Sequence, residues 1–274
     1  MTMSRDQGPG ARGQELSWQQ AAGGWQWAAG RTGRTAVAGP TFGPAVAICA
    51  VLACVLTIVV ARAQEDGVLE SARVTGEAAL VADPAHPMWR EAPRVTITRN
   101  YLGEPIAGPA TEVRSRWTDT DLYLLYICPY ETLNLKPDPD TSTETRRLWS
   151  WDVAEAFIGS NHDHIGAYRE YQVSPQGEWV DLDIDRTDTA AQQGMAWDSG
   201  FLVKARIDEA ARVWYGEMKI PFAAIDPRGP EKGRTLRAGL YRIAGPEPRT
   251  FYAWQPTGQR NYHVPEAFGT LRLQ

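Results

Sequence analysis

The sequence predicts an all-β fold, a β-sandwich of jelly-roll-like type that forms a single domain after an N-terminal export segment. Short runs of β-branched and aromatic residues recur from residue 93 to the C-terminus, separated by clusters of Gly, Pro, Asn and Asp. Aromatic residues are abundant, with 11 Trp and 10 Tyr, as is typical of β-rich proteins. No stretch after residue 63 has the length and period of a long helix.

Eleven segments have the length and composition of strands. They cover residues 94–98, 111–117, 122–128, 153–158, 168–173, 179–184, 201–207, 213–220, 236–243, 250–254 and 269–273. So many short strands without a long helix are typical of two packed sheets.

Side-chain alternation indicates how some of these strands are covered. Residues 122–128 are apolar on both faces, which predicts a central strand covered on both sides. Residues 111–117 and 179–185 carry charged side chains at every second position, which predicts strands with one exposed face. Residues 132–148 have no period and are predicted to form a long loop, a kind of segment that often carries function.

The N-terminal part has the features of an export signal. An apolar, uncharged run at 44–60 is followed by Ala61-Arg62-Ala63, and arginines outnumber acids upstream. This pattern is typical of a signal peptide cleaved before Gln64, so we expect a periplasmic or extracellular protein. Two alternatives stay open: an uncleaved membrane anchor with the domain outside the cytoplasm, and lipidation at Cys54.

The predicted organisation has four parts. Residues 1–43 are interpreted as a disordered or mis-assigned extension, 44–63 as the signal peptide or anchor, 64–82 as a linker and 83–274 as the β-sandwich domain. For residues 64–81 a first strand stays open as the alternative to a linker. After residue 63 the chain carries 23 basic and 31 acidic residues, a net charge of −8. That balance gives no electrostatic footprint for nucleic acid. Cys128 is the single cysteine of this part, so it contains no intramolecular disulfide.

Six short motifs occur in order along residues 83–274. They are Asp-Pro-Ala-His-Pro-Met-Trp at 83–89, Trp-Thr-Asp-Thr-Asp-Leu-Tyr at 117–123, Asp-Val-Ala-Glu-Ala-Phe at 152–157, Trp-Tyr-Gly-Glu-Met-Lys-Ile-Pro-Phe at 214–222, Ala-Trp-Gln-Pro-Thr at 253–257 and His-Val-Pro-Glu-Ala-Phe-Gly at 263–269. Together they resemble the family 9 carbohydrate-binding modules. The resemblance implies a non-catalytic β-sandwich that binds a mono-, oligo- or polysaccharide, often with structural calcium.

The resemblance also implies where the sugar binds, between two aromatic side chains. By position these are Trp149 and Tyr262, both expected to be partly exposed; at the second position the sugar-binding members have Trp. Glu155 falls on the position of a ligand-contacting acid, and Gln172 stands where an Arg contacts the sugar in those members. These two departures predict weaker binding or a different sugar.

The residues themselves leave alternatives beside this assignment. Trp149 ends the long loop, where an aromatic ring is displayed to stack on a sugar, but Trp149 and Trp151 also fit a core role. Glu155 lies between apolar residues on its strand and needs a partner. That partner is either sugar hydroxyls or a structural cation, with Arg242 and Lys219 as the candidates. Arg242 is also predicted to be a ligand-binding residue, the fifth beside Trp149, Tyr262, Glu155 and Gln172.

Two segments carry residues of metal-ligating types. Asp181, Asp183 and Asp185 share one face of a strand and fit either a calcium site or a solvated face. Asn161-His-Asp-His164 contains metal-ligand types but also fits a polar hairpin.

Two other functions remain as alternatives. The first is a glycoside-acting enzyme, although the common catalytic motifs are missing, and Asp152 and Glu155 are three apart on a strand, which directs them to opposite sides. The second is haem b binding for electron transfer, for which four side chains supply ligand types without a common spacing. These are Met88, Met195, Met218 and His263.

Overall fold

The computed structural model describes residues 66–187 and 197–274. The extension at 1–43, the export segment at 44–63 and the haem candidate Met195 lie outside these ranges, so export stays a prediction. Within the ranges, no helix has the length and apolar character needed to cross a membrane.

The predicted all-β fold is confirmed, and every one of the eleven predicted strands is present. The strands are β1 (Val68–Arg73), β2 (Arg94–Ile97), β3 (Thr111–Trp117), β4 (Asp121–Pro129), β5 (Val153–Gly159), β6 (Ala167–Val173), β7 (Trp179–Asp185), β8 (Leu202–Asp208), β9 (Val213–Pro221), β10 (Thr235–Ala244), β11 (Thr250–Ala253) and β12 (Gly269–Leu273). The helices of the described ranges are single turns: α1 (Pro87–Arg90), α2 (Phe222–Ile225), η1 (Leu148–Ser150) and η3 (Pro265–Ala267).

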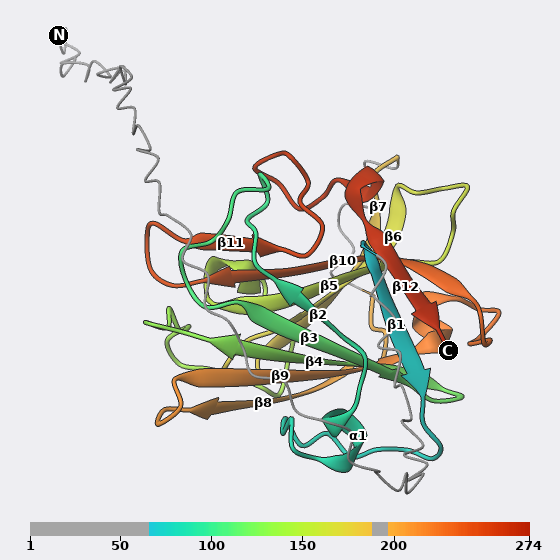
Figure 1. Cartoon of the computed structure of the whole chain (residues 1–274), viewed down its shortest axis with the longest axis horizontal. Helices are drawn as coiled ribbons and strands as arrows, with labels where there is room; N and C mark the ends of the chain where they lie inside the picture. Colours follow the sequence, from blue (N-terminus) through green and yellow to red (C-terminus); the bar gives the residue numbers. More distant parts are fainter. Residues whose placement is uncertain (1–65, 188–196) are drawn as a thin grey trace, which may run out of the picture. The chain divides into compact units, whose positions relative to one another are not determined.

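The strands form two layers that β1 joins. Sheet A has the order β7-β6-β5-β10-β12-β1, with β11 added beside β10, and sheet B has the order β1-β3-β4-β9-β8, with β2 added beside β3. Figure 1 shows β3, β4, β9 and β8 running side by side in sheet B. Most pairs are antiparallel, whereas β1 is parallel to both β12 and β3.

The linker interpretation of residues 64–82 is wrong for β1. Val68 to Ser71 pair with β12, and Ala72 and Arg73 then pair with β3. Leu69 of β1 is fully buried in the main core. The first-strand alternative therefore applies here, because a short strand that bridges two sheets gains hydrogen bonds from both.

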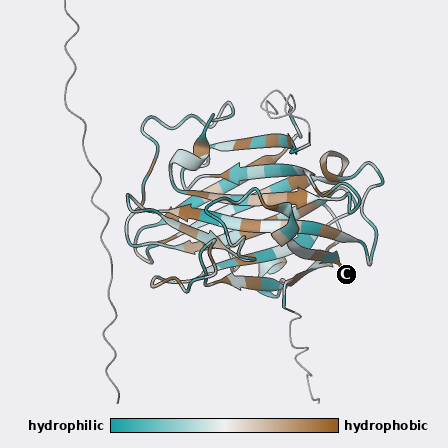
Figure 2. Ribbon diagram, turned by 90° about the horizontal axis from the view of Figure 1, so that it is seen from above, coloured by the Kyte–Doolittle hydropathy of each residue, from teal (hydrophilic) through white to brown (hydrophobic). Residues whose placement is uncertain are grey.

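The main core lies between the two sheets. Polar and apolar residues alternate along many strands (Figure 2), so each strand turns one set of side chains inward. Strand β4 is covered on both sides, as its sequence predicts. Leu124 and Tyr126 enter the main core, while Tyr123 and Leu125 pack with Trp89 on the outer face of sheet B.

The outer face of sheet A carries a second, largely aromatic cluster. Phe157 of β5, Tyr168 of β6 and Tyr241 of β10 are all buried there. Phe157 stacks with Tyr168 at a centroid distance of 5.6 Å and meets Tyr241 edge-on at 5.1 Å. This cluster forms a rigid support for the loops that cross the face.

The aspartates of β7 differ in exposure, although their sequence positions predict a common solvent-facing set. Asp181 is fully buried and accepts a hydrogen bond from the Ser199 backbone at 3.1 Å. Asp183 forms an ion pair with Arg169 at 2.5 Å. Asp181 is covered because the chain that enters β8 folds over this end of β7, which the alternation of β7 alone does not reveal.

Candidate ligand-binding site

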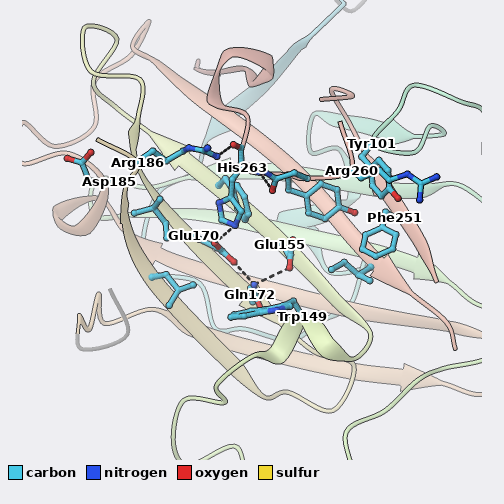
Figure 3. A pocket seen from close by; sticks show the side chains of 16 residues that line it. Tyr101, Trp149, Glu155, Glu170, Gln172, Asp185, Arg186, Phe251, Arg260 and His263 are labelled. Atoms are coloured by element: carbon cyan, nitrogen blue, oxygen red, sulfur yellow. Dashed lines mark hydrogen bonds and ion pairs between the residues drawn. The ribbon is translucent and has the colours of Figure 1, made fainter. Parts of the chain in front are cut away.

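A cavity of about 580 Å³ opens on the outer face of sheet A. Strands β5, β6, β7, β10 and β11 contribute to its walls, together with η1 and the loops around residues 101 and 260–263. Figure 3 shows Glu155, Glu170 and Gln172 close together, with Trp149 on one side and Tyr101 and Phe251 on another. The cavity gathers segments that are far apart in sequence.

Four of the five predicted ligand-binding residues line this cavity. Trp149, Glu155, Gln172 and Tyr262 do so, and Arg242 does not. Strand pairing explains why the two polar residues meet, because Glu155 of β5 stands directly opposite Gln172 of β6. Side chains opposite one another in neighbouring strands project to the same face.

Glu170 belongs to the same polar group. It lies two residues before Gln172 on β6 and therefore shares its face. The Gln172 amide nitrogen donates to Glu155 Oε1 at 3.0 Å and also to Glu170 Oε1. The two carboxyls are thus bridged by one amide, and all three side chains are at most 3% exposed.

Burial disfavours the charged form of both carboxyls. It raises the pKa of Glu170 to about 7, although the hydrogen bond from Gln172 acts in the opposite direction. The pKa of Glu155 is raised well above its usual range, first by burial and then by the charge of Glu170. In the absence of a cation, the floor of the cavity therefore tends to hold protons at neutral pH.

His263 stands over this floor as a neutral ring. Its Nδ1 shares a hydrogen bond of 2.7 Å with the Tyr168 hydroxyl, and its ring lies 5.1 Å from that of Phe157. Burial, followed by the charge of Arg186, lowers the pKa of His263 to about 4. Its Nε2 lies 3.9 Å from Glu170 Oε2, too far for a hydrogen bond.

Trp149 lies at the edge of the cavity within the one-turn helix η1. The turn begins after Arg147, whose φ of 58° is in the left-handed region, and the Trp149 carbonyl accepts a hydrogen bond of 2.8 Å from Arg249. The backbone is thereby fixed, while 36% of the residue stays exposed. An aromatic ring held in this way is available to a ligand.

Tyr262 is placed differently from expectation. It is only 7% exposed, and its ring stacks on Tyr241 at 4.1 Å with an interplanar angle of 9°. Its hydroxyl donates to the carbonyls of Arg242 and Tyr252, both at 3.0 Å. The prediction of a partly exposed ring is wrong here, because remote neighbours on sheet A cover both the ring and its hydroxyl.

Neither of the two predicted cations pairs with Glu155. Glu155 is in register with Tyr241, so the next residue of β10, Arg242, projects to the opposite face. Lys219 forms an ion pair with Glu77 instead. The structural ion pair considered for Glu155 is therefore wrong, and the side chain that hydrogen-bonds to Glu155 is that of Gln172.

Arg242 enters the interior between the sheets. It is 1% exposed, donates to the Thr111 hydroxyl at 2.9 Å, and lies 5.0 Å from the ring centre of Tyr252 and 5.9 Å from that of Trp214. It contributes to a second cavity, of about 590 Å³, that shares Tyr101 with the first. Arg242 therefore does not line the first cavity, contrary to its prediction as a ligand-binding residue, because strand alternation directs its side chain to the opposite face of sheet A.

Among the residues of the first cavity that were not assigned to it from the sequence, three matter most for its shape and polarity. Tyr101 comes from the loop after β2 and Phe251 from β11, and their rings are 5.0 Å apart. No local pattern connects these two positions. Glu170 could have been predicted from the sequence, because any strand that directs Gln172 to the site also directs Glu170 there.

The candidates for other chemistry do not gather at this cavity. Asp152 accepts a hydrogen bond from the Gly245 backbone at 2.6 Å and lies outside the cavity lining. Met218 is in the main core and Met88 in the cluster on sheet B, whereas His263 lines the cavity.

The expected metal sites are not assembled either. Across residues 66–187 and 197–274, no group of three or more His, Cys, Asp or Glu side chains has an arrangement that could hold a metal ion. His162 lies by the Thr235 carbonyl and His164 by Thr187, so the two histidines of the 161–164 segment have separate neighbours. The calcium that the resemblance implies stays a prediction.

Residues 83–274 match the family described as carbohydrate family 9 binding domain-like. Among solved structures, a family 9 module from Caldicellulosiruptor kristjanssonii in complex with cellotriose is similar, with a TM-score of 0.54 and 14% identity over 76% of this chain and 93% of that one. The glucose complex from the same organism has a TM-score of 0.53 and 14% identity over 75% and 95%. No curated protein matches the chain. At such low identity the structural likeness establishes the sandwich fold.

Proposed function

The chain belongs to the carbohydrate family 9 binding domain-like family, and on this premise we propose that the cavity on sheet A holds one sugar unit without transforming it. One observation carries the proposal. The same cavity combines an exposed indole, Trp149, with a buried floor of hydrogen-bonding side chains. Sugar-binding sites need both, because a pyranose has apolar C–H faces and a polar rim of hydroxyls.

The aromatic side chains supply the apolar contact. We place one face of the sugar ring against Trp149 and the other against the group formed by Tyr101, Phe251 and the exposed edge of Tyr262. Tyr101 and Phe251 meet Tyr262 edge-on, at centroid distances of 6.2 and 6.1 Å. In this arrangement Tyr262 supports the rings that touch the sugar more than it touches the sugar itself.

The polar floor supplies the directional contacts. Glu155, Gln172 and Glu170 face the cavity from neighbouring strands, so their oxygen atoms are positioned to accept hydrogen bonds from the donors of a bound sugar. The strands hold them rigidly, which reduces the entropy that is lost on binding. The bound glucose and cellotriose of the similar modules support a hexose-sized ligand here.

Binding to a panel of mono- and oligosaccharides tests this function, with the purified chain in calorimetry or on a glycan array. We expect saturable binding of at least one sugar with a Kd in the millimolar range or tighter. Competition between the monosaccharide and its oligomers would show that both use one cavity. An absence of binding to every sugar at millimolar concentration would remove the proposed function and leave only the fold.

We further propose that the domain works outside the cytoplasm, either free after cleavage or held by its N-terminal segment. The apolar run at 44–60 and Ala61-Arg62-Ala63 support this. N-terminal sequencing of the protein from the producing cells tests it, with Gln64 as the expected first residue. An intact N-terminus in the membrane fraction would support the anchored alternative.

A further inference from the structure

Apart from the protons that the two carboxyls hold near neutral pH, the floor formed by Glu155, Glu170 and Gln172 has one donor group, the Gln172 amide. A glutamine amide nitrogen carries two hydrogens, and Gln172 directs this nitrogen to both Glu155 and Glu170. The atoms left without a hydrogen-bond partner are Gln172 Oε1 and Glu170 Oε2, and both are buried acceptors. Unpaired buried acceptors are costly, so a ligand that donates to them offsets that cost.

No cation of the described residues forms an ion pair with the floor, although the charge of Arg249 acts on Glu155 and opposes the rise in its pKa. Within the described ranges, no Lys or Arg forms an ion pair with Glu155 or Glu170. The nearest bases are bonded elsewhere, exposed or uncharged. Arg186 donates to the His263 carbonyl, and Arg249 donates to the carbonyls of Trp149 and Trp151. Arg260 lines the cavity as an exposed residue, and His263 is neutral above about pH 4. Two buried carboxyls thus share one neutral amide.

From this geometry we propose that the sugar carries a primary ammonium group, which lies between Glu155 and Glu170 on the floor of the cavity. The ligand class is an amino sugar with an unsubstituted amine. The inference rests on the proposed sugar-binding function and specifies its ligand. An ammonium has three donors and no acceptor, which matches a floor whose unpaired atoms are all acceptors.

Other ligand classes match the floor less well. A neutral hydroxyl group donates a single hydrogen and brings no charge to offset that of two carboxylates. An acidic sugar brings a further carboxylate beside the two carboxyls and forms no ion pair with the floor; the cations that line the cavity, Arg186 and Arg260, lie on other parts of its wall. An N-acetylated amine keeps one N–H but loses its charge, and its acetyl group fills the space between the two acids.

Proton release provides a signature that a purely structural role for the two acids would not show. Without a cation, the raised pKa values of Glu155 and Glu170 keep protons on the floor near neutral pH. A bound ammonium stabilises both carboxylates and lowers their pKa values, so binding releases protons to the buffer. Calorimetry in buffers of different ionisation enthalpy measures this release.

The experiment compares matched sugars at pH 6.5, where an aliphatic amine is protonated. Glucosamine, galactosamine and mannosamine are each measured against the N-acetyl sugar and the parent hexose. We expect one hexosamine to bind at least about tenfold more tightly than both neutral counterparts and to release protons as it binds. Tighter binding of chitosan oligosaccharides than of the monomer would support an amine at a polymer end, and equal binding would support a free amino sugar.

Two substitutions localise the effect. Glu170→Gln keeps the shape and removes one charge, and it should reduce the preference for the amine by about tenfold or more. Glu266→Gln removes the same charge from an exposed residue outside the cavity lining and should keep the preference. Equal loss in both variants would attribute the preference to long-range electrostatics and overturn the inference.

The outcomes separate this inference from the proposed function. If a neutral hexose binds as tightly as every hexosamine, without proton release, the ammonium site is wrong and sugar binding stands. If no sugar of either kind binds, both are wrong. The comparison of ligands on the unsubstituted chain decides between these outcomes even if Glu170→Gln does not fold.

Discussion

Glu217 and Glu170 are both buried in the interior of a strand, yet their surroundings differ. Glu217 of β9, on sheet B, is fully buried and accepts three hydrogen bonds, from the backbone nitrogens of Val81 and Ala82 at 2.7 and 2.6 Å and from Trp89 Nε1 at 2.9 Å. Glu170, on sheet A, has the Gln172 amide at Oε1, and its Oε2 has no hydrogen-bond partner.

The difference separates a structural carboxyl from one that is available to a ligand. Removing a carboxylate from water is costly unless its oxygens find donors. The donors around Glu217 offset that cost and tie the segment before α1 to sheet B. At Glu170 the cost is only partly offset within the chain, and the free oxygen faces a cavity. Burial alone does not distinguish the two roles, whereas the count of donors and the direction of the unpaired oxygen do.

The largest expected effect belongs to Glu217→Ala. The change leaves three buried N–H groups without an acceptor, so we expect a loss of about 3 to 5 kcal/mol in the free energy of unfolding. Thermal denaturation should show a fall in Tm of roughly 10 °C, while the folded fraction keeps its affinity for sugar. The isosteric Glu170→Gln is the matched comparison. If it destabilises the chain as much as Glu217→Ala does, the two carboxyls do not differ in the way described above.

The second effect is a pH dependence that the sugar-free chain should show. The pKa of Glu170 is raised from an ordinary 4.5 to about 7, so the unfolded state loses this proton at lower pH than the folded state. Its contribution to stability is therefore complete below about pH 4.5, falls as the pH rises to about 7, and is constant above that. Melting curves across this range should show a shallower decline for Glu170→Gln. An unchanged slope would contradict the assignment.

The fold was predictable from the sequence because the pattern of polar and apolar residues within a single strand indicates how that strand is covered. Alternation within β3 and the two-sided apolar pattern of β4 reflect the layers that cover each strand. Strand β1 was left undecided between a linker and a strand, because its partners, β12 and β3, are remote in the chain and its six residues have no strong period of their own.

The site was predictable only in part, for a related reason. Glu155 and Gln172 were identified because the family resemblance assigns positions, and strand pairing then brings them together. The exposure of Tyr262 depends on Tyr241 and Tyr101, which come from other segments. No pattern within one segment predicts which of two aromatic residues a distant ring will cover.

The contrast between Trp149 and Tyr262 gives the third prediction. Trp149 is 36% exposed at the cavity, so Trp149→Ala should lower sugar affinity at least tenfold, about 1.4 kcal/mol, with a shift in Tm of only a few degrees. Trp151→Ala, two residues away and outside the cavity lining, is the matched control and should retain affinity. Collapse of the fold in Trp149→Ala, or undiminished binding, would show that Trp149 does not form a wall of the sugar site.

The smallest expected effect is that of Tyr262→Phe, which removes only the hydroxyl. That hydroxyl donates to two buried carbonyls, of Arg242 and Tyr252, so its loss should cost about 1 kcal/mol of stability and lower Tm by roughly 2 to 4 °C. Sugar affinity should stay within about twofold, because the ring and its edge contacts with Tyr101 and Phe251 remain. Calorimetric titrations of Tyr262→Phe and Trp149→Ala with the same sugar compare a ring that supports the site, Tyr262, with a ring that contacts the sugar, Trp149. A tenfold loss of affinity with an unchanged Tm would instead make the Tyr262 hydroxyl a direct ligand of the sugar and reverse the roles of the two aromatic residues.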